Sequence, residues 1–339
     1  MNILRRVLLK RSVVVVVALL FLTTVKSYPT SMGEAQYVDV DGIRTRYFEG
    51  GSGEAMLLVH GGGIGGVISA VGWMPIFPSL AEHFHVYAID KLGCGLTENP
   101  TSDEDYKMGA TVRHLYRFLE TMGIDQVHLV GHSRGGLPVA RITMDHPERV
   151  KTLTLFDSDT LAPGDPVRQP RELGPPGPPP TAESLRERVL SNETTFHTDF
   201  LTDELLEAQL EVALNPKIRE GAERMEMLRR RFIEDEPEKV KARPGLANNS
   251  GTAWWLYETK DETLDMLRAG RLQTPTHLIW GFNDPRATYK LGMDLFLLIS
   301  ESIDRAQIDF LNKSGHYPWQ EYPQEVIDLM LSFIESVKD

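Results

Sequence analysis

The fold is decided by residues 127–136, VHLVGHSRGG, in which a short, mainly apolar run leads directly into a Gly-x-Ser-x-Gly pattern. The apolar run predicts a buried strand, and Gly135–Asp145 behind it has the spacing of a helix. A serine between glycines, in a tight turn from strand to helix, is typical of a nucleophile held above the end of a sheet. The alternative is a serine that only caps the helix. Five matched positions in this context favour a nucleophilic Ser133.

A serine is a weak nucleophile at neutral pH and needs a base. His316 lies in the loop after the last expected strand, which ends at the same sheet edge as Ser133. The orienting acid should lie between the serine and the histidine in the chain, where Asp284 follows a strand. Asp157 and Asp159, which follow a different strand, are rival candidates. We therefore expect Ser133, Asp284 and His316 to be catalytic.

An oxyanion formed at a carbonyl needs two N–H donors that are fixed in advance. One donor should be the backbone of Arg134, the residue after the serine. The other should be Gly62 or Gly63, in the glycine-rich run His60–Gly66, where the backbone can approach more closely than a Cβ would allow. A phosphate-binding loop is the usual alternative for such a run, but no Lys-Ser or Lys-Thr follows it. These residues therefore predict an oxyanion hole.

Buried strands alternate with helices along most of the chain, which predicts an α/β fold: a mostly parallel sheet with helices on both faces. A proline-rich stretch, Leu161–Thr181, interrupts the alternation, and residues 182–270 are charged and helical in pattern. We expect residues 161–270 to form a linker and a helical cap over the carboxyl edge of the sheet, where such sheets bind ligands. The α/β core then comprises residues 34–160 and 271–339. The eight expected strands are 36–40, 43–47, 55–60, 84–89, 127–130, 151–156, 276–280 and 306–310.

The first 33 residues differ in charge from the rest of the chain. The 339 residues carry a formal net charge of −12, which disfavours non-specific binding of nucleic acid, yet residues 1–33 hold five basic residues and no acidic one. Their apolar run, Val13–Leu22, is too short to span a bilayer. This pattern predicts a secretory signal cut near Ser27, or an N-terminal anchor, in a secreted, periplasmic or membrane-anchored protein. A cytoplasmic protein that starts at Met32 is the alternative.

These motifs, in this order, resemble the α/β-hydrolase superfamily over nearly all of residues 36–337. The runs at 60–66, 129–161, 280–285 and 315–321 look like those of the meta-cleavage-product hydrolases. This resemblance implies hydrolysis of a carbon–carbon bond in vinylogous 1,5-diketones made by ring-opening dioxygenases. It implies that the substrate first ketonises, and that Ser133 or water then attacks the distal ketone, with His316 as acid and base. It implies no metal ion and no organic cofactor.

Four further residues are expected to contact the substrate, and three of them depart from the family pattern. The family usually has Asn where this chain has His132, and Trp where it has Tyr317, with Trp319 two residues further on. The cap arginine that binds the substrate carboxylate aligns with Gln209, whose neutral amide forms no ion pair. A carboxylesterase or lactonase is therefore the alternative enzyme, and a non-catalytic ligand receptor on the same fold is the alternative of another class.

The expected partner is a small-molecule substrate and not a nucleic acid. A membrane contact would involve only residues 1–25, if they are not cleaved. A homodimer is an open alternative to a monomer.

Overall fold

The computed structural model describes residues 32–164, 180–190, 195–248 and 252–338. Residues 1–31 of the predicted signal or anchor lie outside these ranges, and so does most of the proline-rich stretch. No helix within them is both long and apolar enough to cross a bilayer.

The described residues form a sheet of eight strands in the order β1-β2-β4-β3-β5-β6-β7-β8. Strand β2 runs antiparallel to β1 and β4, and every other neighbouring pair is parallel. The prediction of a mostly parallel, eight-stranded sheet is therefore confirmed. The strands are β1 (Gln36–Val40), β2 (Ile43–Gly51), β3 (Ala55–Val59), β4 (His85–Ile89), β5 (Val127–His132), β6 (Val150–Phe156), β7 (Thr276–Gly281) and β8 (Ala306–Leu311).

Side chains of the central strands alternate between two apolar cores. In β3, Leu57 and Val59 belong to one core, whereas Met56 and Leu58 belong to the other. All four are fully buried, so this strand is covered on both faces. Such double burial is expected of a parallel sheet, whose crossover helices lie on its faces.

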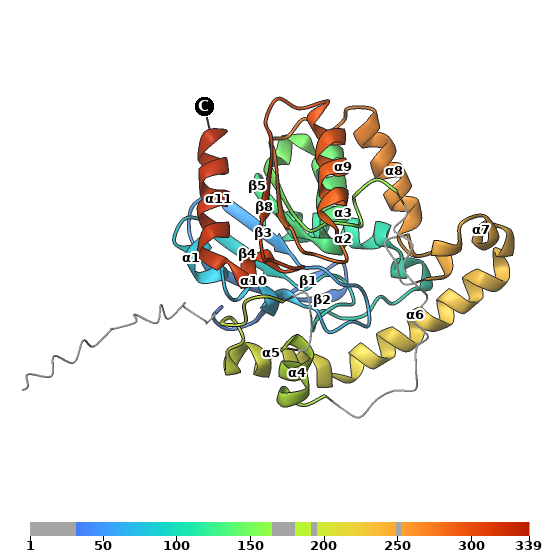
Figure 1. Ribbon diagram of the computed structural model, residues 1–339. Coiled ribbons are helices and arrows are strands. Elements are labelled where there is room, and N and C mark those ends of the chain that lie inside the picture. The colour runs from blue at the N-terminus through green and yellow to red at the C-terminus, as the bar shows by residue number, and fades with distance from the viewer. Residues whose placement is uncertain (1–31, 165–179, 191–194, 249–251, 339) are drawn as a thin grey trace, which may run out of the picture.

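Two groups of helices provide these covers (Figure 1). One core includes residues of α2 (Met108–Thr121), α3 (Gly136–Asp145), α8 (Tyr257–Arg268) and α9 (Tyr289–Ser300). The other includes residues of α1 (Phe77–Ala81) and α11 (Pro323–Ser336).

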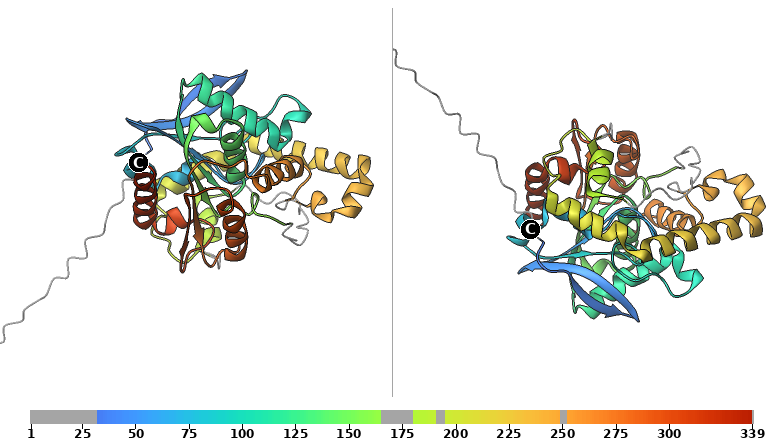
Figure 2. Two further views of the ribbon diagram at one scale, coloured as in Figure 1. Left: turned by 90° about the horizontal axis from the view of Figure 1, so that it is seen from above. Right: turned by 90° about the horizontal axis from the view of Figure 1, so that it is seen from below.

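Between β6 and β7 the chain also forms α4 (Ala182–Leu190), α5 (Asp203–Leu214), α6 (Pro216–Asp235) and α7 (Pro237–Ala242), which lie outside these two layers (Figure 2). The start of α6 is joined to the loop that follows β4. There the Asn99 side chain donates to the Lys217 carbonyl at 2.9 Å, and Lys217 Nζ donates to the Gly95 carbonyl at 3.0 Å. Because the loop leaves the carboxyl end of β4, these contacts place α6 at the edge of the sheet where the predicted site lies.

The main difference from the predicted elements is at β2, which continues four residues beyond the expected end at Tyr47. Its last residues are Phe48-Glu49-Gly50-Gly51, of which the two glycines have low strand propensity and indicate a turn by themselves. They pair with β4 in an antiparallel register that ends with Gly51 opposite His85. The neighbouring strand therefore determines this part of the structure.

Candidate active site

Ser133 lies in a strained turn between β5 and α3. Its φ of 49° falls in the left-handed region, which residues other than glycine rarely adopt. The Ser158 hydroxyl fixes the turn by donating to the Ser133 carbonyl at 2.7 Å. Strain of this kind persists only where the surroundings enforce it.

Close packing of α3 against the strands provides that enforcement. A Cβ on Gly131 would collide with the Val139 side chain, and a Cβ on Gly135 would collide with the Val59 carbonyl on β3. The first helical turn can therefore lie directly against the ends of β3 and β5 only because both positions are glycine. This is the physical reason for the glycines of the Gly-x-Ser-x-Gly pattern.

Ser133, His316 and Asp284 form one chain of hydrogen bonds. His316 Nε2 lies 3.1 Å from Ser133 Oγ, and His316 Nδ1 lies 2.5 Å from Asp284 Oδ2. Both distances fit a neutral imidazole that carries its proton on Nδ1, donates to Asp284 and accepts from the serine hydroxyl. The structure thus brings together, with the expected spacing, the three residues predicted from separate motifs.

Asp284 is held as a carboxylate. Burial would raise the pKa of this carboxyl, but the charge and hydrogen bond of His316 and the backbone N–H of Arg286 lower its pKa below the ordinary value. The Arg286 N–H donates to Asp284 Oδ1 at 2.7 Å. Asp284 can therefore stabilise a positive charge on His316.

The rival acid Asp157 has a different role. Its Oδ1 accepts a hydrogen bond from the Gly281 N–H at 2.9 Å, which ties the end of β6 to the end of β7. Burial, together with the negative charge of Asp284, raises the pKa of Asp157 well above the ordinary value, which disfavours the charged form of this carboxyl. The other rival, Asp159, accepts a long hydrogen bond, 3.4 Å, from the Thr160 hydroxyl.

Asp157, Asp284 and His316 each place one potential metal-ligating atom within 4.8 Å of the others. A metal ion would need a charged Asp157 and the His316 Nδ1 lone pair. In this structure the raised pKa of Asp157 disfavours its charged form, and His316 Nδ1 is engaged by Asp284. The cluster therefore fits a hydrogen-bonded unit better than a metal site.

The glycine-rich loop after β3 lies against the serine. A Cβ on Gly61 would come within 3.0 Å of Ser133 Cβ and 2.7 Å of His132 Nδ1. Gly62 has a φ of 67°, which favours glycine. In the described part of the chain, the N–H groups of Gly62 and Gly63 donate no hydrogen bond to the protein. They are suited to bind an anion formed next to Ser133.

The aromatic residues predicted to contact substrate lie close to His316. His132 Nε2 is 2.9 Å from the His316 carbonyl, and the Tyr317 ring centre is 5.3 Å from that of His316. Trp319, in contrast, is 2% exposed; it stacks on Trp73 and donates its indole N–H to the Gly72 carbonyl at 2.9 Å. These contacts give Trp319 a packing role, and its contact with substrate stays a prediction.

The fourth predicted contact, Gln209, is half-buried on α5, one turn after the buried Leu205. Two arginines near the site were not predicted. Burial raises the pKa of the Tyr317 phenol, and the positive charges of Arg286 and of Arg188, on α4, partly oppose this rise. No motif marks these arginines or the supporting Ser158, because only the folded chain brings them to the site.

The family model of the α/β hydrolase fold matches residues 54–293. The chain belongs to this family. Over 294 residues it is 27% identical to a 2-hydroxymuconate semialdehyde hydrolase of Pseudomonas sp. (strain CF600). This alignment covers 86% of this chain and 91% of that relative. It is 39% identical to a 2-hydroxy-6-oxo-6-(2'-aminophenyl)hexa-2,4-dienoic acid hydrolase of Metapseudomonas resinovorans, but over 127 residues, 37% of this chain and 43% of that relative.

Solved structures show the same fold. A meta-cleavage product hydrolase from Pseudomonas fluorescens IP01 is 23% identical with a TM-score of 0.64, covering 89% of this chain and 98% of that one. A membrane phospholipase A is 22% identical with a TM-score of 0.64, over 90% and 87% of the two chains. The predictions of an α/β-hydrolase fold and of a hydrolase are therefore confirmed.

Gly131→Ala should lower the free energy of unfolding by about 2 kcal/mol or more, because the new methyl group overpacks the contact with Val139. Urea unfolding followed by circular dichroism measures this loss. Gly109→Ala, on α2, is the matched control: the nearest atom to a new Cβ there is 3.7 Å away, so its stability should not fall. Equal stability of the two variants would contradict the account of the turn.

Asp284→Asn should slow the labelling of Ser133 by a fluorophosphonate by about 10⁴-fold, because the amide no longer holds His316 in the required tautomer. Asp157→Asn is the matched control. It keeps an acceptor oxygen for Gly281 and leaves the hydrogen bond between Asp284 and His316 in place, so labelling should change less than about threefold. A large loss in Asp157→Asn with little loss in Asp284→Asn would show that Asp157 is the orienting acid.

Proposed function

We propose that this protein hydrolyses a carbon–carbon bond in a 2-hydroxy-6-oxo-dienoate, with Ser133 as nucleophile, His316 as acid and base, and Asp284 as its partner. The observation that carries the proposal is the hydrogen-bonded chain from Ser133 Oγ to Asp284, at 3.1 and 2.5 Å. The relatives aligned over most of the chain support the substrate class, because they are named as hydrolases of such dienoates.

In the first step, His316 Nε2 accepts the Ser133 proton while Ser133 Oγ forms a bond to the distal carbonyl carbon of the ketonised substrate. The carbonyl oxygen becomes an oxyanion, which the N–H groups of Gly62 or Gly63 and of Arg134 stabilise. Preorganised donors at this position supply a large part of the rate enhancement.

In the second step, the carbon–carbon bond next to this carbonyl breaks. Its electron pair moves into the vinylogous dienolate, which is conjugated with the 2-keto group, and the leaving fragment takes the proton from His316. Water, deprotonated by His316, then attacks the acyl group on Ser133 and releases a carboxylic acid. One water is consumed, and no external oxidant or reductant is needed.

Substrate selection would depend on side chains around His316. Tyr317 and His132 present aromatic surface there, with centres 5.0 Å apart. Burial, and then the proximity of His316, lower the pKa of His132 well below its ordinary value, so this ring stays neutral when His316 is protonated. Gln209 on α5 would donate one amide hydrogen bond to the dienoate carboxylate, and Arg188 on α4 would provide the nearby positive charge.

Ester or lactone hydrolysis is the second candidate. It is favoured by Gln209, which stands where the resembled family has a carboxylate-binding arginine. The same Ser133–His316–Asp284 chain would cleave an ester without a carboxylate anchor, and an exported enzyme, as residues 1–33 predict, would meet such substrates.

A paired assay separates these functions. Purified protein is given a ring-fission dienoate, whose visible absorbance disappears on cleavage, and in parallel short-chain p-nitrophenyl esters. We expect a kcat/KM at least about tenfold higher for the dienoate. Ser133→Ala should lower both activities by more than about 10⁴-fold without loss of fold.

Rapid ester cleavage without dienoate loss would favour the second candidate. Absence of both activities in a folded protein would contradict the proposal and favour a ligand receptor.

A further inference from the structure

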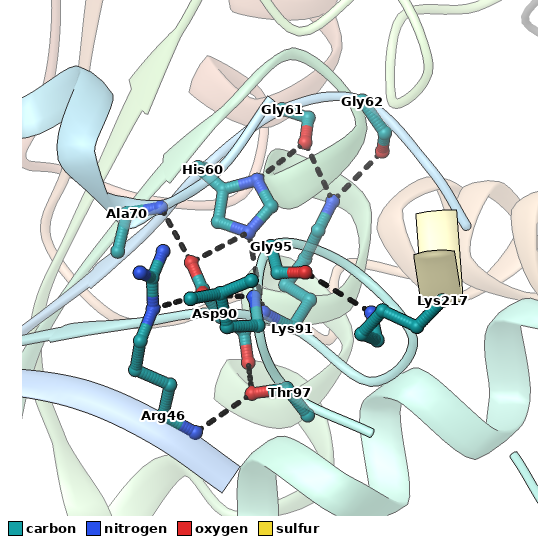
Figure 3. Close-up of polar contacts among 11 residues, drawn as sticks. Arg46, His60, Gly61, Gly62, Ala70, Asp90, Lys91, Gly95, Thr97 and Lys217 are labelled. Carbon is teal, nitrogen blue, oxygen red and sulfur yellow. Dashed lines mark hydrogen bonds and ion pairs between the residues drawn. The ribbon is translucent and has the colours of Figure 1, made fainter. Parts of the chain in front are cut away.

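A buried lysine binds the backbone of the glycine-rich loop. Lys91 lies two residues after β4 and is 2% exposed. Its ammonium donates to the Gly61 carbonyl at 3.0 Å and to the Gly62 carbonyl at 2.9 Å (Figure 3). These carbonyls belong to the two peptide groups whose N–H groups are those of Gly62 and Gly63.

This contact determines where the two N–H groups point. Both peptides are trans, and in a trans peptide the C=O and the N–H point in opposite directions. A cation that holds the Gly61 and Gly62 carbonyls on one side of the loop therefore directs the N–H groups of Gly62 and Gly63 to the other side.

Neighbouring groups fix both ends of the contact. The His60 ring lies 2.7 Å from the Gly61 carbonyl through Nδ1, and its Nε2 accepts from the Lys91 backbone N–H at 3.2 Å. Burial lowers the pKa of His60 well below its ordinary value, which agrees with a neutral ring that donates through Nδ1 and accepts through Nε2. Three hydrogen bonds thus join the loop after β3 to the loop after β4: two from the Lys91 ammonium and one from the Lys91 backbone N–H.

Asp90, the residue before the lysine, is held in place by hydrogen bonds to its carboxylate. Its carboxylate accepts from Arg46 Nε at 2.6 Å and from the backbone N–H of Ala70 at 2.7 Å (Figure 3). It also accepts from the backbone N–H of Leu96 at 2.7 Å. The carboxylate is therefore already bound by donors other than the Lys91 ammonium. Lys91 is directed to the carbonyls of the glycine-rich loop.

We propose that Lys91 is a positioning residue, which holds the Gly61 and Gly62 carbonyls so that the N–H groups of Gly62 and Gly63 face the oxyanion formed at Ser133. This inference rests on the proposed function of the serine. It extends that function by assigning the orientation of the donors to a side chain that does not touch the substrate.

The free-energy cost of burying the charged Lys91 ammonium supports a role for this residue beyond packing. Burial, with a smaller contribution from the charge of Arg134, lowers the pKa of Lys91 to about 8, although the nearby Cys94 opposes the shift. A methionine would fill similar space without desolvating a charge. What methionine lacks is the pair of hydrogen bonds to the loop.

Lys91→Met is the decisive variant, and Lys217→Met is its matched control. Lys217 belongs to the same group of residues in Figure 3, but its ammonium donates to the Gly95 carbonyl and not to the glycine-rich loop. The two variants are compared with the wild type by steady-state kinetics, on whichever substrate the wild type cleaves. Lys91→Met should lower kcat by about 10- to 100-fold and keep KM within about threefold, since loss of one oxyanion donor costs about 10²- to 10³-fold in kcat. Lys217→Met should retain at least half of kcat.

A second measurement reports on the oxyanion itself. An aryl trifluoromethyl ketone should form a hemiketal with Ser133, seen by ¹⁹F NMR, whose oxyanion occupies the same donors. Lys91→Met should weaken this inhibitor by about as much as it lowers kcat. Lys91→Gln, which keeps one N–H donor group, should lie between the wild type and Lys91→Met in both measurements, and it replaces Lys91→Met if that variant fails to fold.

Unchanged kcat and unchanged hemiketal affinity in the lysine variants would overturn the inference. So would equal losses in the Lys91 and Lys217 variants, because these would show a general effect of removing a lysine from this group of residues. A wild type that forms no hemiketal and hydrolyses neither substrate would instead overturn the proposed function, and the inference with it.

Discussion

The backbone of Ser133 is the constraint on which the site depends. A φ of 49° at a serine is unfavourable in isolation, and it persists because α3 starts in direct contact with β3 and β5. The same contact directs the serine hydroxyl towards His316, which comes from the loop after β8. Packing in the centre of the sheet therefore determines the position of the Ser133 hydroxyl oxygen.

The buried ionisable groups around that oxygen have pKa values shifted in different directions. Asp157 and Asp284 are close neighbours whose pKa values are shifted in opposite directions: burial and the charge of Asp284 raise the pKa of Asp157, whereas the contact with His316 lowers the pKa of Asp284. His132 is kept neutral beside His316. In the proposed reaction His316 gains a proton, and the Asp284 carboxylate bonded to it stabilises that charge.

Sequence patterns could predict the parts of the site that lie at strand ends. Ser133, Asp284 and His316 each follow a recognisable apolar strand, and parallel strands bring their carboxyl ends to one edge. The contact between Lys91 and the glycine-rich loop could not be predicted in this way, because it joins two loops through backbone carbonyls. The stacking of Trp319 on Trp73 could not be predicted either, because it depends on tertiary packing; the contact of Trp319 with substrate stays a prediction.

The central claim is that Ser133 attacks the substrate and carries its acyl group. Rapid quenching of the dienoate reaction within one turnover, followed by peptide mass spectrometry, tests it most directly. The account predicts an added mass equal to the acyl fragment on the peptide that contains Ser133, appearing before the carboxylic acid is released. Full turnover with no acylated peptide at any time, or with the acyl group on another residue, would contradict it.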